Sequence, residues 1–139
     1  MSSNQDCIFC RIANGEIPSN TVYENSDFKV ILDVAPAAKG HCLILPKEHF
    51  KNIFDIDADT AAKLFSLATE VARALRQELH CDGLNIVQNN GAAAGQTVDH
   101  VHLHLIPRFE DDDVSIGWNP KQSDSQELAQ LAKALRKRI

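Results

Sequence analysis

Short runs of apolar residues, separated by polar turns, predict that much of this chain forms β-strands. Each run has the length of a strand, and polar or turn-forming residues stand between neighbouring runs. Consecutive strands joined by short turns can pair antiparallel, whereas parallel pairing needs a long crossover. The predicted strands are residues 21–24, 28–32, 41–45, 84–88 and 100–106.

A longer apolar pattern between the third and fourth strands predicts a helix from Asp57 to about His80. Asp57 can cap the first turn, and Gly83 lies just past the end, where helices often stop. Apolar side chains recur at intervals of three and four residues and would form one buried face. They are Leu64, Leu67, Ala68, Val71, Leu75 and Leu79.

Two further helices are predicted near the ends of the chain. Residues 7–13 form a short helix that stops at the Asn-Gly pair after it. Ser123 and Gln126 are spaced as a capping box for a last helix, whose apolar side carries Leu128, Leu131 and Leu135. The order of strands and helices indicates an α+β domain with helices packed on a sheet.

Composition and charge restrict the possible partners. Hydrophobic residues make up 44% and charged residues 24% of the 139 residues, which is typical of one globular domain over residues 1–139. The net charge of −5 and the dispersed basic residues argue against nucleic acid as a partner. The N-terminal residues lack the pattern of a signal peptide, and no apolar run approaches the ~18 residues of a membrane span. We therefore expect a cytoplasmic protein with reduced cysteines and no membrane partner.

Residues 100–106 alternate three histidines with apolar residues. Because side chains alternate along a strand, His100, His102 and His104 share one face, and the apolar residues can pack on the core from the other. Clustered imidazoles have to be exposed or fully hydrogen-bonded, since burying them without partners is costly. One alternative is a polar outer strand face, and another is a three-histidine metal site. A functional cluster is favoured over a plain polar face, where histidine supplies little that Thr or Lys would not.

Cys7 and Cys10 have the spacing of two metal ligands on one tight turn. A redox pair has the same spacing, but it usually opens a helix after a strand in a βαβ unit, which the pattern here lacks. Cys42 and Cys81 stand alone beside apolar residues and are interpreted as packing residues.

The loop at residues 89–97 is rich in glycine and alanine. Small residues let backbone N–H groups approach phosphate oxygens closely. No Gly-Lys-Ser/Thr follows, so this is not a Walker loop. Taken alone, without the neighbouring histidines, the loop would be interpreted as an ordinary turn.

The histidine pattern at residues 100–106 resembles the signature of the HIT (histidine triad) superfamily. Other segments also match that family in order and spacing, and the resemblance extends from about Cys7 to Arg108, leaving residues 109–139 as a tail and helix. It is closest to the small nucleotide-binding members with phosphoramidase or nucleoside-polyphosphate hydrolase activity. The other matching segments are residues 7–18, 32–36, 41–49 and 95–98.

The resemblance implies a five-stranded antiparallel sheet with a long central helix and a C-terminal helix. It also implies a homodimer whose sheet continues across the interface. The expected substrate is a purine nucleotide, with adenosine as the expected nucleoside.

The resemblance also implies roles for the histidines. His102 would attack the α-phosphate and form a nucleotidyl-histidine, which water then hydrolyses to a nucleoside monophosphate. The backbone near His100 would orient the nucleophile, and His104 would donate a hydrogen bond to a phosphate oxygen. Gln96 and Thr97 would lie near the leaving group and the bridging atom.

Further roles follow from the same resemblance. Asp33 would accept hydrogen bonds from the ribose hydroxyls, Asn89 would contact the phosphate side of the ligand, and His41 would support the triad at the substrate site. A structural zinc would be held by four ligands with no open position, namely Cys7, Cys10, His49 and His100.

Two other hypotheses remain open from the sequence. The protein could be a nucleotide-binding interaction protein with incidental hydrolysis, or a catalytic metal centre that depends on His102 and His104. Two departures from the family pattern affect the leaving group: Thr97 stands where many phosphoramidases have serine, and the tail after Arg108 is longer than that branch shows.

Overall fold

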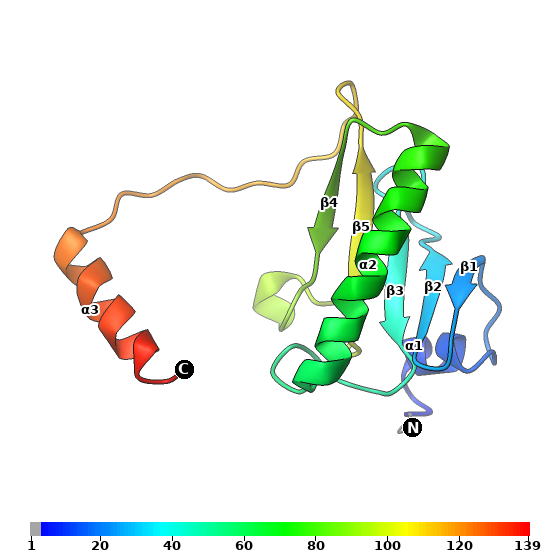
Figure 1. Ribbon diagram of the computed structural model, residues 1–139, viewed down its shortest axis with the longest axis horizontal. Coiled ribbons are helices and arrows are strands. Elements are labelled where there is room, and N and C mark those ends of the chain that lie inside the picture. Colours follow the sequence, from blue (N-terminus) through cyan, green and yellow to red (C-terminus); the bar gives the residue numbers. More distant parts are fainter. Residues whose placement is uncertain (1–3) are drawn as a thin grey trace.

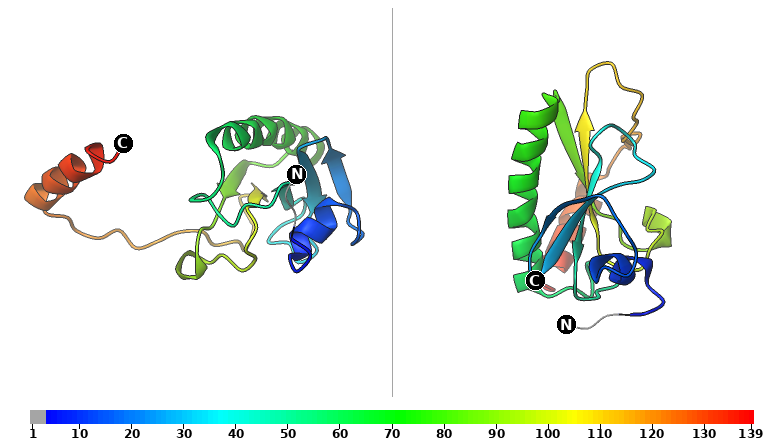
Figure 2. Two further views of the ribbon diagram at one scale, coloured as in Figure 1. Left: turned by 90° about the horizontal axis from the view of Figure 1, so that it is seen from below. Right: turned by 90° about the vertical axis from the view of Figure 1, so that its right-hand side faces the viewer.

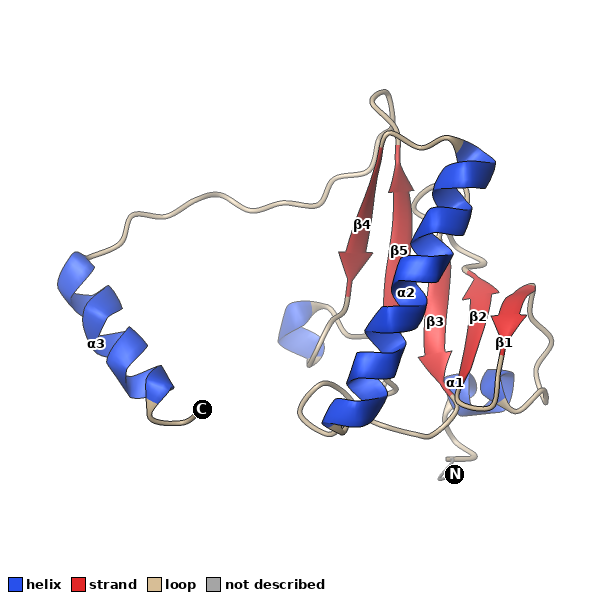
Figure 3. Ribbon diagram, in the orientation of Figure 1, coloured by secondary structure: helices blue, strands red, loops and turns tan. Residues whose placement is uncertain are grey.

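The computed structural model describes residues 4–139, which form an antiparallel sheet of five strands in the order β1-β2-β3-β5-β4 (Figures 1 and 3). The first three strands are neighbours in chain order, joined by a short turn at residues 25–27 and a longer loop at residues 33–41, and β5 is inserted between β3 and β4. This antiparallel sheet confirms the predicted fold class. The strands are β1 Thr21–Glu24, β2 Phe28–Leu32, β3 Cys42–Pro46, β4 Gly83–Val87 and β5 Leu103–Arg108.

Helices cover both faces of this sheet (Figure 2). The long helix α2, Ala58–Leu79, packs its buried leucines, alanine and valine on one face, against Val30, Ile44 and Leu105. The short helix α1, Ile8–Ala13, lies on the other face, where Ile12 joins Leu43 and Leu45 in a second apolar cluster. The three-residue 3₁₀ helix η1, Ala92–Ala94, interrupts the loop before β5. Two apolar layers therefore hold the central strands from both sides.

The histidine segment enters the sheet later than its alternating pattern predicts. Strand β5 begins at Leu103, because its ladder with β3 starts where Leu103 pairs with Ile44. Before that point the backbone bonds elsewhere, with the Val101 N–H donating to the Phe50 carbonyl at 2.7 Å. Side chains nevertheless alternate as predicted, since Val101 and Leu103 belong to the core under α2.

The helix ends confirm one predicted cap and correct two others. Asp57 caps α2 as expected and accepts a hydrogen bond from the Thr60 N–H at 3.0 Å. The helix stops at His80, which itself adopts the left-handed conformation (φ 54°), whereas Gly83 already starts β4. The helix α3, Ser125–Arg136, is capped by Asp124 and not by Ser123, because the carboxylate one residue later accepts from the Gln126 N–H.

Helix α3 lies apart from the sheet, at the end of an extended connection (Figure 1). None of its residues is buried. The prediction that the helices pack on the sheet is therefore correct for α2 and wrong for α3 within this chain. Across residues 4–139, no helix is both long enough and apolar enough to cross a membrane.

Candidate active site and metal cluster

The three histidines of the triad lie on the face of the sheet that α2 does not cover. His104 pairs with Leu43 in the ladder between β5 and β3, and Leu43 belongs to the cluster on the α1 side. His100 is completely buried and His102 is 6% exposed, while His104 is half-buried. Such imidazoles need hydrogen-bond partners, and these partners determine which nitrogen of each ring carries the proton.

His102 has a defined tautomer. Its Nδ1 lies 2.7 Å from the backbone oxygen of His100, and a carbonyl oxygen can only accept a hydrogen bond. The proton of the neutral ring is therefore on Nδ1, and Nε2 keeps a free lone pair. The Phe9 ring contacts this imidazole edge to face, with centroids 4.8 Å apart, and restricts its rotation.

A chain of hydrogen bonds sets the opposite tautomer in His104. The Ala37 N–H donates to His41 Nδ1 at 3.0 Å, so the proton of neutral His41 is on Nε2. That nitrogen lies 2.9 Å from His104 Nδ1 and donates to it. Neutral His104 then carries its own proton on Nε2, where it can be donated to a ligand. The site thus combines one imidazole lone pair with one imidazole N–H donor.

The surroundings keep these imidazoles neutral near pH 7. Burial lowers the pKa of His102. Burial, followed by the neighbouring His102 and His41 rings, lowers the pKa of His104 to about 4. Burial also lowers the pKa of His41, although the Asp33 carboxylate partly offsets this effect. A neutral imidazole is the form that can act as a nucleophile.

Asp33 lies at the end of β2 beside His41. Its Oδ1 accepts a hydrogen bond from the Ala35 N–H at 2.9 Å, and its Oδ2 lies 3.6 Å from His41 Nε2. A carboxylate has lone pairs for further donors. Asp33, His41 and His104 are also close enough to hold an ion, but the bond between the two imidazoles already uses the facing nitrogens.

The loop before β5 is held in shape by Gln96. Its Oε1 accepts from the Gly91 N–H at 2.7 Å, and its Nε2 donates to the carbonyls of Lys51 and Val98. These three hydrogen bonds of the Gln96 side-chain amide hold the loop in one conformation. Asn89 lies against Gly95, where an added Cβ would be 3.7 Å from its Nδ2. Thr97 is exposed.

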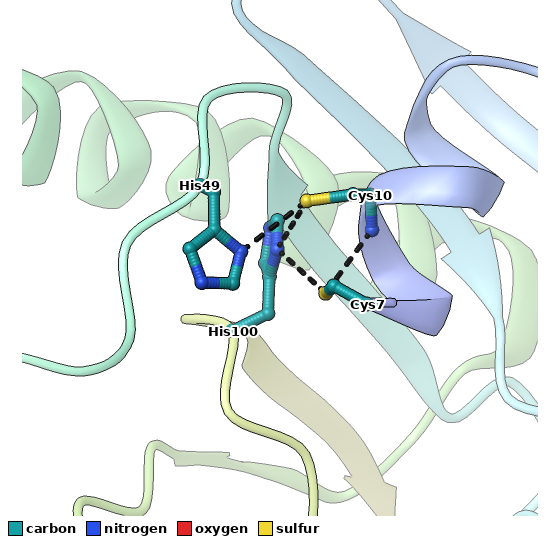
Figure 4. A group of neighbouring side chains, drawn as sticks. All are labelled: Cys7, Cys10, His49 and His100. Carbon is teal, nitrogen blue, oxygen red and sulfur yellow. Dashed lines mark hydrogen bonds between the residues drawn. The ribbon is translucent and has the colours of Figure 1, made fainter. Parts of the chain in front are cut away.

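Cys7, Cys10, His49 and His100 form a group that could hold a metal ion (Figure 4). Their ligand atoms all lie within 4.8 Å of one another. Cys10 Sγ lies 3.2 Å from His49 Nδ1, and Cys7 Sγ lies 3.4 Å from His100 Nδ1. In a tetrahedral zinc site, sulfur and nitrogen ligands are about 3.5 Å apart, as Zn–S and Zn–N lengths of about 2.3 and 2.0–2.1 Å require. The group therefore fits a four-coordinate ion with little movement.

His100 connects this group to His102. Its Nε2–H donates to the Pro46 carbonyl at 2.8 Å, which leaves Nδ1 facing the two sulfurs. A backbone carbonyl commonly fixes the outer nitrogen of a metal-binding histidine in this way. The backbone oxygen of the same residue orients His102. One residue therefore serves both the metal-ligand group and the triad.

The structure shows three partners that sequence reasoning did not identify: the Phe9 ring, the Pro46 carbonyl and the Ala37 N–H. Phe9 stands between the two cysteines of the Cys-x-x-Cys motif, so its position could have suggested proximity to the triad. The other two act through the backbone, for which residue type gives no signal. All the expected site residues, from Cys7 to His104, lie in the described part of the chain.

An alternating histidine cluster on an antiparallel sheet, next to a Cys-Cys-His-His group, defines a histidine-triad protein. The family model described as "HIT domain" matches residues 14–111. The chain therefore belongs to the HIT family.

Several relatives resemble this chain over most of its length. Adenosine 5'-monophosphoramidase HNT1 of Saccharomyces cerevisiae is 40% identical over 130 residues, covering 93% of this chain and 80% of that protein. The crystal structure of SMU.412c from Streptococcus mutans has 45% identity and a TM-score of 0.95, covering 99% of this chain and 88% of the other.

Two further solved structures are informative. A HIT family protein from Bacillus anthracis has 36% identity and a TM-score of 0.92, and the match covers 99% of both chains. A histidine triad family protein from Mycobacterium smegmatis, described as zinc-bound, has 40% identity and a TM-score of 0.75, covering 92% of this chain and 96% of the other.

Proposed function

We propose that this protein is a nucleotide hydrolase or transferase that acts at the α-phosphate of a purine nucleotide, with adenosine as the preferred nucleoside. The bond it breaks is the P–N bond of a nucleoside phosphoramidate or a phosphoanhydride of a nucleoside polyphosphate. The observation that carries this proposal is the 2.7 Å contact from His102 Nδ1 to the His100 carbonyl, which leaves Nε2 as a free nucleophile. Similarity to a yeast adenosine 5'-monophosphoramidase supports the choice of substrate.

The reaction would run in two displacements. The Nε2 lone pair of His102 attacks the α-phosphorus, an N–P bond forms, and the bond from phosphorus to the leaving nitrogen or oxygen breaks. The leaving group takes up a proton from solvent as it departs. Water then attacks the same phosphorus and loses a proton to solvent, the electron pair of the N–P bond returns to His102 Nε2, and the nucleoside monophosphate is released. The His100 carbonyl stabilises the imidazolium that forms during the first step.

The neighbouring residues would bind and orient the nucleotide. His104 Nε2–H donates to a phosphate oxygen, because the His41 relay keeps the proton on that nitrogen. Asp33 accepts from the ribose hydroxyls, and Asn89 contacts the phosphate side. The Gln96 side chain holds the loop through its hydrogen bonds to backbone groups, and Gln96 and Thr97 lie near the leaving group. Small residues in this loop let its N–H groups approach the phosphate.

The metal in the cluster of Cys7, Cys10, His49 and His100 would be zinc. Two thiolates and two imidazoles are a donor set that suits zinc, and four protein ligands make the site structural. The bound ion would attach α1 to the segment before β5 and fix the ring of His100. The zinc-bound M. smegmatis relative supports this assignment.

The free edge of β4 would pair with a second copy of this chain to form a homodimer with a continuous sheet. Strand β4 is the last strand of the sheet, and Ile86 on it is 38% exposed. An apolar edge strand needs cover to avoid unspecific pairing. We also expect the protein to act in the cytoplasm, where its thiols stay reduced.

The test is release of AMP from adenosine 5'-phosphoramidate and from a dinucleoside polyphosphate by wild-type protein and by His102→Ala. His80→Ala is the matched control, because His80 is exposed at the end of α2 and far in sequence from the triad. Release from one substrate, abolished only in His102→Ala, is expected and identifies the bond. Equal release by wild type and His102→Ala would contradict the proposal. Tight AMP binding without any release would favour a nucleotide-binding interaction protein.

A further inference from the structure

The C-terminal arm, residues 109–139, ends in a helix whose apolar face has no cover from its own chain. Leu128, Leu131 and Leu135 recur on one side of α3 and are 54%, 57% and 51% exposed. An isolated helix of 12 residues is only marginally stable in water, and tertiary packing supplies most helical stability in proteins. The helix therefore needs an apolar surface on which to bury these leucines.

The first residues of the C-terminal arm are hydrogen-bonded to the sheet. Arg108 at the end of β5 donates to both carboxylate oxygens of Asp112 and to the Val114 carbonyl, at 2.7–3.0 Å. A further bond of 2.8 Å joins Arg108 to the Asn85 side chain on β4. These bonds determine the direction in which the chain leaves the body of the protein, by which we mean residues 4–108. From there the connection to α3 runs extended past the free edge of β4 (Figure 1).

The body carries apolar side chains at this same edge. Ile53 and Phe65 are 55% and 56% exposed and line a hollow together with Gln88, which follows β4. The Ile53 N–H donates to the Asn90 side chain, so this patch and the end of β4 adjoin. Pairing of two β4 edges would cover apolar surface of this kind and bring a second body beneath the arm.

The extended arm also recurs in solved relatives. Residues 109–139 are more than a fifth of the chain. TM-scores of 0.95 and 0.92 over 99% of the chain could not be reached if this fifth lay elsewhere in the S. mutans and B. anthracis crystal structures. An arm without support from its own body keeps one position when another molecule holds it.

We propose that the C-terminal arms are exchanged between two copies of this chain, with the leucine face of α3 buried on the body of the partner. The basic end of α3, with Lys133, Arg136, Lys137 and Arg138, suits a body of net negative charge. This inference rests on the proposed homodimer, and it does not depend on the proposed reaction.

The first experiment detects contacts between chains. Full-length chains carrying ¹³C-labelled leucine and isoleucine methyl groups are refolded together with unlabelled chains, and nuclear Overhauser effects between labelled and unlabelled molecules are recorded. We expect such effects from the Leu128 and Leu131 methyls. Effects from these methyls only within one chain would overturn the exchange.

The second experiment compares variants by hydrogen exchange and by the concentration dependence of molecular mass. Leu131→Glu should lose amide protection throughout α3 and shift the dimer towards monomer, whereas Gln130→Glu on the opposite face should match wild type. Unprotected α3 amides in the wild-type dimer would also refute the exchange. AMP release is measured on the same samples: a free arm in an active protein refutes only the exchange, and an exchanged arm in an inactive protein refutes only the proposed reaction.

Discussion

Removing the His41 side chain should disturb the tautomer of His104 without removing any group that the substrate touches. In the structure His41 Nε2 donates to His104 Nδ1 at 2.9 Å, and the Ala37 N–H holds the other side of the His41 ring. The variant His41→Leu deletes this donor. His104 is then free to move its proton to Nδ1, and in that form it has no N–H to offer a phosphate oxygen.

The size of the effect follows from one hydrogen bond. A bond of this kind contributes about 0.5–1.5 kcal/mol, which shifts the ratio of the two tautomers by about two- to tenfold. Because the rate follows the fraction of His104 in the Nε2–H form, we expect kcat/KM for AMP release to fall by at most this factor. Deleting the donor itself, in His104→Ala, removes a stabilising contact and should cost on the order of 10²–10³.

The tautomers can be observed directly from ¹⁵N chemical shifts of the imidazole rings near pH 7. Wild-type protein should show protonated Nε2 in His41 and His104 but protonated Nδ1 in His102. In His41→Leu the His104 signals should move towards a mixture, and His41→Gln, whose amide can donate to the same nitrogen, should restore most of the rate. A fall in kcat/KM of more than 100-fold in His41→Leu, or unchanged His104 ¹⁵N shifts, would refute control of the His104 tautomer by His41.

Three further predictions concern the metal group, acid stability and one glycine. Cys10→Ser should abolish binding of one zinc per chain by elemental analysis and lower the melting temperature, whereas Cys81→Ser should not; equal zinc content in both would contradict the assignment. The pKa of His104 is about 4, so below pH 6.5 the unfolded chain binds a proton that the folded chain does not, and the free energy of unfolding should decrease from pH 6.5 to 4, less steeply in His104→Gln. If urea titrations gave the same pH dependence of the free energy of unfolding for wild type and His104→Gln, this prediction would be wrong. Gly40 has φ +86°, and a Cβ there would collide with Leu79. Gly40→Ala should therefore lower the free energy of unfolding by about 1–3 kcal/mol more than Gly15→Ala, which shares the backbone strain but meets no atom within 4 Å. Equal urea midpoints for the two variants would contradict this contact.

Alternation in the sequence was sufficient to predict the two faces of the histidine segment. Val101 and Leu103 face α2 and the histidines face the other side, although the strand itself starts only at Leu103. Side-chain direction follows the extended backbone, while the start of a strand depends on the partner strand, which the local sequence does not contain. The predicted packing of α3 on the sheet is wrong for a related reason. Its leucines indicate that one face is buried, but they do not show which molecule buries it.

The metal group and the tautomers differ in how far sequence could predict them. Cys7 and Cys10 are recognisable by spacing, but His100 is 93 residues from Cys7, and only the family pattern connected them. The tautomer of each imidazole depends on backbone groups at Pro46, Ala37 and His100 itself. Every residue has a backbone carbonyl and every residue except proline has an N–H, so residue type does not reveal which of these groups will face an imidazole in the folded chain.

Attack by His102 on the α-phosphorus is tested by trapping the covalent intermediate. Wild-type protein is mixed with an adenosine phosphoramidate labelled in the α-phosphate, quenched within milliseconds at alkaline pH, where phosphoramidate bonds to histidine survive, and digested for mass spectrometry. We expect one nucleotidyl group on the peptide containing residues 100–106, attached to His102, and none in His102→Ala. Label on His104, or rapid AMP release with no labelled peptide at any time, would contradict attack by His102.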